Sequence, residues 1–210
     1  MQISDGSFSA ICNLQSAILN KMATINKNLS EYDKNSIPNA KNFRFGIVVS
    51  EWNDTITEGL CFGAVTGLLE NEVPSANIIR WNVPGSFELI YGAKKMLQTQ
   101  NVDAVIAIGC VIQGQTKHFD FVCEAVSQGI KDLNIETDIP VIFCVLTDHN
   151  MQQSIDRSGG KHGNKGTEAA VAAIKMAYLR HQASFSHQFK DQQLLSTGPL
   201  QIEGLKMIEE

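Results

Sequence analysis

The sequence lacks any segment suited to crossing or entering a membrane. Its apolar runs are short and interrupted, whereas a membrane-spanning helix needs about 20 consecutive apolar residues. The N-terminus also lacks the basic start of a secretory signal, since the first lysine is Lys21. We therefore expect a cytoplasmic protein that does not associate with membranes.

Cysteine is sparse, and no two cysteines form a CxxC pair. Three of the five cysteines lie inside apolar stretches, where a thiol most often acts as a small hydrophobic side chain. This pattern is typical of a reducing compartment and argues against a disulfide framework or a zinc site.

A net positive charge and nucleotide-binding motifs are missing as well. A formal net charge of -5 argues against nucleic acid as the main partner, because phosphate binding needs a concentrated positive surface. Neither GxGxxG nor a Walker-type GxxxxGK(S/T) motif occurs, which disfavours a nucleotide phosphate site.

What is present is an alternation of apolar runs with helical patterns. The runs are nearly continuous, which favours strands covered on both faces of a parallel sheet. The predicted strands are residues 43–49, 77–83, 104–108 and 140–146. The predicted helices are residues 56–70, 87–98, 119–133 and 165–178. This order predicts one α/β domain with right-handed crossovers and helices on both faces of the sheet.

Both ends of the chain differ from this pattern. Residues 1–42 are rich in Asn, Ser and Lys and predict an N-terminal arm that is partly disordered. The domain is expected over residues 43–180 and a polar tail over residues 181–210, in which residues 200–210 form a short amphipathic segment. One hypothesis is that the protein starts at Met22 instead of Met1. Mass spectrometry of the protein expressed from its native gene would test it.

Polar and aromatic side chains follow each predicted strand in turn. Ligands of open parallel sheets bind outside the carboxyl ends of the strands. The segments at those ends are residues 50–55, 83–88, 109–118 and 147–149. Four segments on one edge predict a single composite site.

A glycine turn leads into the third helix. Gly114 and Thr116 precede its start, where free amide groups and the helix dipole favour an anion, although these residues alone favour capping by Thr116 slightly over phosphate binding. His118 lies in the first turn, where the dipole disfavours its protonated form and favours acid–base work over a role as a plain surface histidine.

Three further side chains each allow two interpretations. Trp52 is either a buried hydrophobic plug or a stacking face for a planar ligand. Glu88 either complements a helix dipole or binds hydroxyl groups, and it can do both. Arg157 is either a phosphate clamp or part of a flexible, solvated loop rich in glycine over residues 156–166.

Together these segments resemble the lumazine synthase family. The matching motifs are EWNDTIT, VPGSFEL, GCVIQGQTKHFDFV, and PVIFCVLT with DRSGGKHGNKG, and the match runs without an evident gap from about residue 44 to residue 177. The resemblance implies a flavodoxin-like three-layer α/β/α fold with a four-stranded parallel sheet, flanked by both tails. It also implies condensation of 5-amino-6-ribitylaminouracil with 3,4-dihydroxy-2-butanone 4-phosphate to 6,7-dimethyl-8-ribityllumazine, without a metal or other cofactor.

The resemblance assigns a role to each matching residue. His118 would transfer protons, and Gln115, Thr116 and Arg157 would bind phosphate. Phe143 would reach the pocket from a neighbouring subunit. The residues implied to bind the pyrimidine and its ribityl chain are Trp52, Asn53, Ser86, Phe87, Glu88, Val111, Ile112, Phe143 and Lys165. One departure lies beside this set, since Gln113 stands where the family usually has Arg.

The resemblance extends to assembly. It implies a homopentamer with sites shared between subunits, and the short turn over residues 159–164 matches members that build sixty-subunit shells. Riboflavin synthase is a candidate partner. The alternatives are a flavin-binding module without catalysis, a cage protein with vestigial activity and another phosphosugar enzyme. The pairing of His118 with an anion site at Thr116 and Arg157 favours the synthase.

Overall fold

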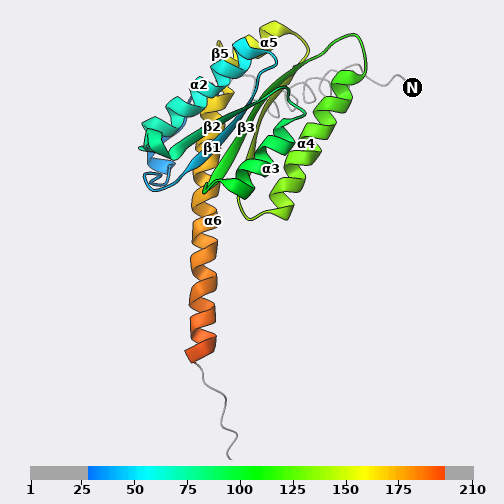
Figure 1. Cartoon of the computed structure of the whole chain (residues 1–210). Coiled ribbons are helices and arrows are strands. Elements are labelled where there is room, and N and C mark those ends of the chain that lie inside the picture. Colours follow the sequence, from blue (N-terminus) through cyan, green and yellow to red (C-terminus); the bar gives the residue numbers. More distant parts are fainter. Residues whose placement is uncertain (1–27, 197–210) are drawn as a thin grey trace, which may run out of the picture.

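The computed structural model describes the backbone of residues 28–196 and the side chains of residues 28–184 (Figure 1). Met22, the predicted segment 200–210 and the outer parts of both predicted tails lie outside the described residues. Within the described part, no helix combines the length and apolar character that crossing a membrane requires.

A four-stranded parallel sheet forms the centre of the domain, as the sequence predicted. Its strands are β1 (Phe45–Ser50), β2 (Ile78–Val83), β3 (Ala104–Ile112) and β4 (Val141–Asp148). Their order is β2-β1-β3-β4, so β2 and β4 are the edge strands. β3 is longer than predicted, because Gly109–Ile112 continues the pairing with β4 as far as Asp148. These residues were expected in a loop, and that expectation was wrong.

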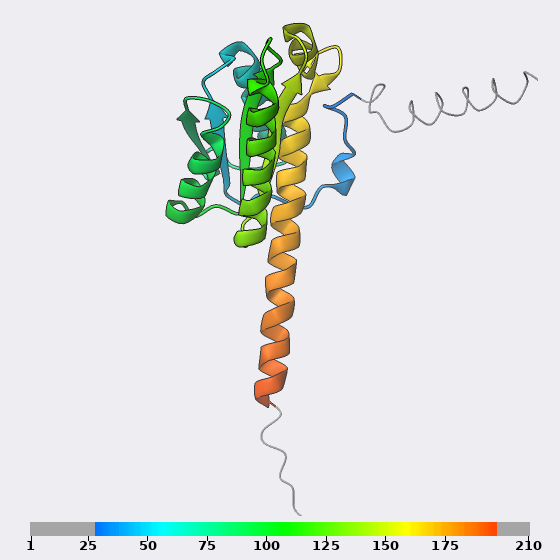
Figure 2. The ribbon, with the colours of Figure 1, turned by 90° about the vertical axis from the view of Figure 1, so that its right-hand side faces the viewer.

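Helices cover both faces of the sheet (Figures 1 and 2). α2 (Asp54–Glu70) and α6 (Lys165–Ser196) pack on one face, while α3 (Leu89–Thr99) and α4 (His118–Glu136) pack on the other. Each face therefore has its own apolar core, which confirms the predicted three-layer α/β/α arrangement. Close approach of α3 to the sheet depends on Gly92, where a Cβ atom would come within 2.8 Å of the Val48 and Val83 side chains.

The glycine-rich segment, for which a flexible loop was one interpretation, contains regular secondary structure. α5 (Met151–Arg157) is followed by a small hairpin of β5 (Ser158–Gly160) and β6 (Gly163–Asn164). Gly159 and Gly163 adopt positive φ angles of 126° and 83°, which other residues rarely tolerate. A helix with its own cap and a tight hairpin therefore use these residues, and the turn at residues 159–161 is exposed. The cap is the Asn150 side chain, which accepts the amide of Gln153.

The described part of the N-terminal arm lies along this hairpin. The Leu29 amide donates to the His162 carbonyl at 2.8 Å, and the Ser30 hydroxyl accepts the Asn164 amide at 2.9 Å. Short 3-10 helices form at Lys34–Ser36 and at Ser75–Asn77. Residues 28–42 thus contact the domain directly.

α6 continues well past the predicted end at residue 178. Figure 2 shows its C-terminal half projecting beyond the sheet. A polar sequence argues against burial but not against an exposed helix, which is why composition alone suggested a tail.

Candidate active site

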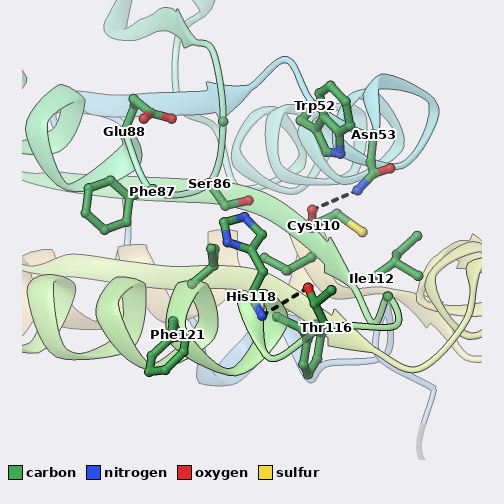
Figure 3. A pocket seen from close by; sticks show the side chains of 15 residues that line it. Trp52, Asn53, Ser86, Phe87, Glu88, Cys110, Ile112, Thr116, His118 and Phe121 are labelled. Carbon is green, nitrogen blue, oxygen red and sulfur yellow. Dashed lines mark hydrogen bonds between the residues drawn. The ribbon is translucent and has the colours of Figure 1, made fainter.

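A cavity of about 620 Å³ lies at the carboxyl ends of β1, β2 and β3 (Figure 3). Residues from the segments after these strands line it, together with the first turns of α4. The lining residues are Trp52, Asn53, Gly85, Ser86, Phe87, Glu88, Cys110, Val111, Ile112, Gly114, Thr116, His118, Phe119, Phe121 and Val122. The topology brings three of the four predicted strand-end segments to one place, as expected for a parallel sheet.

Trp52 presents an open aromatic surface at the mouth of this cavity. It is 72% exposed, which rules out the interpretation as a buried plug. The next residue, Asn53, has a φ of 61°, and its side-chain amide donates to the Cys110 carbonyl at 2.9 Å. This bond joins the end of β1 to β3 and fixes the backbone that carries Trp52.

The segment after β2 contributes a polar group without a partner. Ser86 is 6% exposed, and its hydroxyl makes no hydrogen bond with the described residues. Gly109 allows this placement, since a Cβ atom there would lie 2.7 Å from the Ser86 hydroxyl oxygen. Phe87 and Glu88 follow Ser86 and are exposed, with Glu88 just before the first residue of α3.

The start of α4 forms the third wall. His118 is its first residue, as predicted within the first turn, and its amide donates to the Thr116 hydroxyl at 3.4 Å. Lys117 directly precedes the helix, and its own side chain makes no capping bond. The Thr116 hydroxyl instead accepts an amide of the first turn, which agrees with the capping interpretation of Thr116. A helix start with a nearby hydroxyl is also suited to binding an anion.

Four predicted residues do not line this cavity: Gln115, Phe143, Arg157 and Lys165. Arg157 forms an ion pair with Asp148 at 3.3 Å, and Lys165 pairs with Glu168 at 2.6 Å. Phe143 lies on the edge strand β4 and is 38% exposed. Within a single chain, Phe143, Arg157 and Lys165 therefore stay outside the cavity of Trp52 and His118, whereas Gln115 adjoins it between the lining residues Gly114 and Thr116.

Several lining residues were not predicted. Phe119, Phe121 and Val122 lie on α4 near His118, and Phe121 is 68% exposed. Their position in the sequence, within about one helical turn of His118, could have predicted that they line the cavity. Cys110 also lines the cavity, and burial raises the pKa of its thiol, so it stays protonated near neutral pH. It is therefore a poor nucleophile.

The remaining described cysteines are also free. Burial raises the pKa of Cys144 to about 12, and it raises the pKa of Cys61 and Cys123 as well. In the part of the chain that the structure covers, no three His, Cys, Asp or Glu side chains gather in a group that could hold a metal ion.

The sequence is similar to one protein family and to several of its members. The family described as 6,7-dimethyl-8-ribityllumazine synthase matches residues 42–181. A protein of that name from Flavobacterium johnsoniae is 81% identical over 182 residues, which cover 87% of this chain and 95% of the relative. Another from Flavobacterium psychrophilum is 70% identical over 186 residues, covering 89% and 98%. A third, from Phocaeicola vulgatus, is 56% identical over 155 residues, covering 74% and 92%.

Proposed function

The chain belongs to the 6,7-dimethyl-8-ribityllumazine synthase family, and from that premise we propose that the cavity beside Trp52 and His118 is its active site. The enzyme condenses 5-amino-6-ribitylaminouracil with 3,4-dihydroxy-2-butanone 4-phosphate and forms 6,7-dimethyl-8-ribityllumazine, the penultimate step of riboflavin biosynthesis. The observation that carries the site assignment is the exposed Trp52 ring on the same cavity as His118 and the start of α4.

The pyrimidine substrate occupies the side of the cavity near Trp52. Its flat ring stacks on the indole, which removes apolar area of both groups from water. Asn53, Val111 and Ile112 line the ring edge, with Ser86 and Phe87 beside them. The exposed Glu88 carboxylate accepts hydrogen bonds from ribityl hydroxyls, and such charge-assisted bonds are stronger than neutral ones.

The phosphate of the second substrate occupies the start of α4. The Thr116 hydroxyl and the first amides of the helix are the donors there, and Gln115 adjoins them in the exposed turn. The amides and the dipole at a helix start favour an anion there.

The reaction needs positioning and proton transfer. The substrate amine attacks the ketone and water leaves to form a Schiff base, after which phosphate is eliminated. The second nitrogen then attacks the remaining carbonyl, and loss of a second water closes the ring. His118 accepts and returns protons in these steps, which contributes about 10²-fold or more in rate. Holding both substrates in one cavity contributes further by making the encounter intramolecular.

Phe143, Arg157 and Lys165 complete the site of a neighbouring copy in a homopentamer. The family resemblance assigns Arg157 to the phosphate, and Phe143 and Lys165 to the pyrimidine and its ribityl chain. None of the three lines the cavity of its own chain. Phe143 shares its face of β4 with the buried Val141 and Val145, so its exposure leaves apolar area open at an edge of the sheet. A head-to-tail ring places this edge against the next cavity.

Mixed pentamers test the shared site. His118→Ala and Arg157→Ala chains are unfolded, refolded together and assayed against each variant alone. If one chain supplies His118 and its neighbour Arg157, random mixing restores about a quarter of the sites. Mass measurement by light scattering gives five times the 23.1 kDa chain mass for a free pentamer, or sixty times that mass for a shell. A monomeric enzyme, or mixtures no more active than their components, would refute the shared site.

Three further assignments concern the surroundings of the enzyme. The short turn between β5 and β6 supports sixty-subunit shells, which electron microscopy detects directly. Riboflavin synthase, which consumes the product, is the partner that co-purification tests. A cytoplasmic location is supported by four free thiols in the described residues, since disulfides are rare in reducing compartments.

Turnover with the two purified substrates, followed by product fluorescence, tests the site as a whole. We expect product without added metal or cofactor and slow turnover in His118→Ala. Unchanged turnover in both His118→Ala and Trp52→Ala would place the chemistry elsewhere. Tight binding of the pyrimidine or a flavin without any turnover would point instead to a binding module.

A further inference from the structure

A buried carboxylate holds Arg157 at the end of β4. Asp148 is 8% exposed, and its Oδ1 accepts a hydrogen bond from Arg157 Nη1 at 3.3 Å. Its Oδ2 accepts from the Ser154 hydroxyl at 2.8 Å. Among the described cations, Arg157 is the one within ion-pair distance of this carboxylate. A buried charge of this kind requires such a partner, so the contact is specific.

The other contacts of Arg157 fix the direction of its guanidinium. Nη1 also donates to the Gln153 carbonyl at 3.2 Å, so one nitrogen is held by two acceptors. Nε and Nη2 make no hydrogen bond with the residues whose side chains are described, and the Arg157 side chain is 39% exposed. The guanidinium thus keeps donors free on the side that is not bound to Asp148.

Asp148 is itself anchored to the sheet. Its partner Ser154 accepts a hydrogen bond from the buried Cys110 thiol at 3.5 Å, and Asp148 is paired with Ile112 in the register of β3 and β4. Cys110 and Ile112 also line the cavity of the same chain. The carboxylate is therefore held by two neighbouring strands and by α5.

We propose that Asp148 is a positioning residue that pre-orients Arg157 for the phosphate of 3,4-dihydroxy-2-butanone 4-phosphate. This inference rests on the proposed phosphate role of Arg157. A free arginine loses considerable rotamer freedom when it binds a ligand, and an arginine that is already held loses less. Asp148 and Ser154 do not contact substrate; they act through the guanidinium.

A direct electrostatic effect of Asp148 would have the opposite sign. A carboxylate close to a phosphate repels it, so removing the charge would tighten binding. Removing a positioning residue weakens binding instead. Asp148→Asn separates the two effects, because it keeps the size of the side chain while removing the charge and one acceptor.

The experiment measures KM for each substrate and competitive inhibition by inorganic phosphate in Asp148→Asn, Arg157→Ala and the double variant. We expect Asp148→Asn to raise KM for the phosphorylated substrate roughly tenfold, as for loss of one charge-assisted hydrogen bond. Inhibition by phosphate weakens in parallel, while KM for the pyrimidine stays unchanged. In the Arg157→Ala background, Asp148→Asn adds no further effect, which a merely structural role would not produce.

Ser154→Ala is the second variant, since it loosens Asp148 while keeping the charge, and we expect a smaller increase in the same KM. Glu58→Gln is the matched control, because Glu58 pairs with Arg80 on α2 and β2, away from the cavity. An unchanged or lower KM in Asp148→Asn, or an effect that persists without Arg157, would overturn the positioning role. If Arg157→Ala itself leaves KM for the phosphorylated substrate unchanged, the proposed role of Arg157 fails first.

Discussion

Some side chains of the cavity are left in environments that the folded chain alone does not favour. Trp52 exposes most of a large apolar ring, and Ser86 buries a hydroxyl without a partner. Each arrangement costs stability relative to a packed ring or a bonded hydroxyl. Such local costs concentrate at functional sites, where a ligand supplies the missing contacts. We therefore expect that mutating either residue weakens substrate binding without lowering the stability of the fold.

Ser86→Ala separates these effects. Removing an unpaired buried hydroxyl leaves the free energy of unfolding unchanged or raises it by about 1 kcal/mol, because no hydrogen bond is lost. KM for 5-amino-6-ribitylaminouracil rises roughly fivefold, since the substrate loses a partner. Thermal unfolding and steady-state kinetics measure both. A loss of stability above about 1 kcal/mol would mean that the hydroxyl has a partner within the chain.

His118→Ala lowers kcat by about 10²-fold and leaves KM for both substrates nearly unchanged, because it removes proton transfer but not binding. The pH dependence of kcat near neutrality weakens as well. His162→Ala is the control, since His162 lies on the turn between β5 and β6 and does not line the cavity. Equal losses in both variants would argue against a specific role for His118.

The sequence predicted the residues of the cavity better than the partners of those residues. Trp52, Ser86 and His118 follow strands or open a helix, so the rule for parallel sheets places them at one edge without any coordinates. The contact of Arg157 with Asp148 depends on the angle at which α5 meets β4, which no spacing in the sequence encodes. The separation of Arg157 from Trp52 within one chain likewise required the structure.

At the scale of elements, Asn164 joins the hairpin of β5 and β6 to two helices. Its side-chain amide donates to the carbonyls of Gly59 and Ser158 at 2.8 and 3.1 Å, and its Oδ1 accepts the Gly166 amide at 2.8 Å. Asn164 is 8% exposed, so these groups lack ready access to water. One side chain therefore satisfies backbone groups of α2, β5 and α6.

Asn164→Ala leaves these backbone groups unpaired and lowers the free energy of unfolding by about 2–4 kcal/mol. Chemical denaturation with urea measures the change. Asn35→Ala is the matched control, since Asn35 is exposed in a short 3-10 helix and we expect a change within about 0.5 kcal/mol. Comparable small effects in both variants would show that Asn164 is not a structural centre of this region.

The helices and strands that were predicted most accurately are those with the most apolar sequences. Every strand of the four-stranded sheet begins within two residues of its predicted start, because buried parallel strands produce apolar runs with sharp boundaries. α5 and the small hairpin bury few side chains and were missed, since glycines with positive φ define the turn instead. The outer half of α6 was missed for a related reason, because an exposed helix needs no apolar stripe.

At the scale of the whole molecule, α6 contacts the amino ends of the sheet strands, which lie opposite the cavity. Arg180 Nε donates to Asp138 at 2.7 Å, and His181 Nε2 lies 2.7 Å from an oxygen of Asp103. The other oxygen of Asp103 accepts the Arg44 amide at 2.8 Å. One turn of α6 thus contacts the connections that precede β1, β3 and β4. It therefore holds these three connections together at the amino end of the sheet.

Two truncations test whether this turn is where the domain ends. A chain that stops after residue 184 keeps Arg180 and His181, and we expect the melting temperature and kcat of the full chain. A chain that stops after residue 179 loses both side chains and the contact of the His181 ring with Phe43, whose centroids are 4.9 Å apart. We expect a loss of about 2 kcal/mol in the free energy of unfolding, since the partly buried Asp103 is left without Arg180 and His181.

That loss lowers the melting temperature by roughly 4–8 °C for a domain of this size. Activity per folded chain stays unchanged, because the truncated turn lies at the opposite end of the strands from Trp52 and His118. Asp103→Asn in the full chain provides the comparison that leaves the length of α6 intact, and it should reproduce part of the loss. If truncation after residue 184 already destabilises the protein as much as truncation after residue 179, the outer part of α6 contributes to the fold and the domain boundary lies further along the helix.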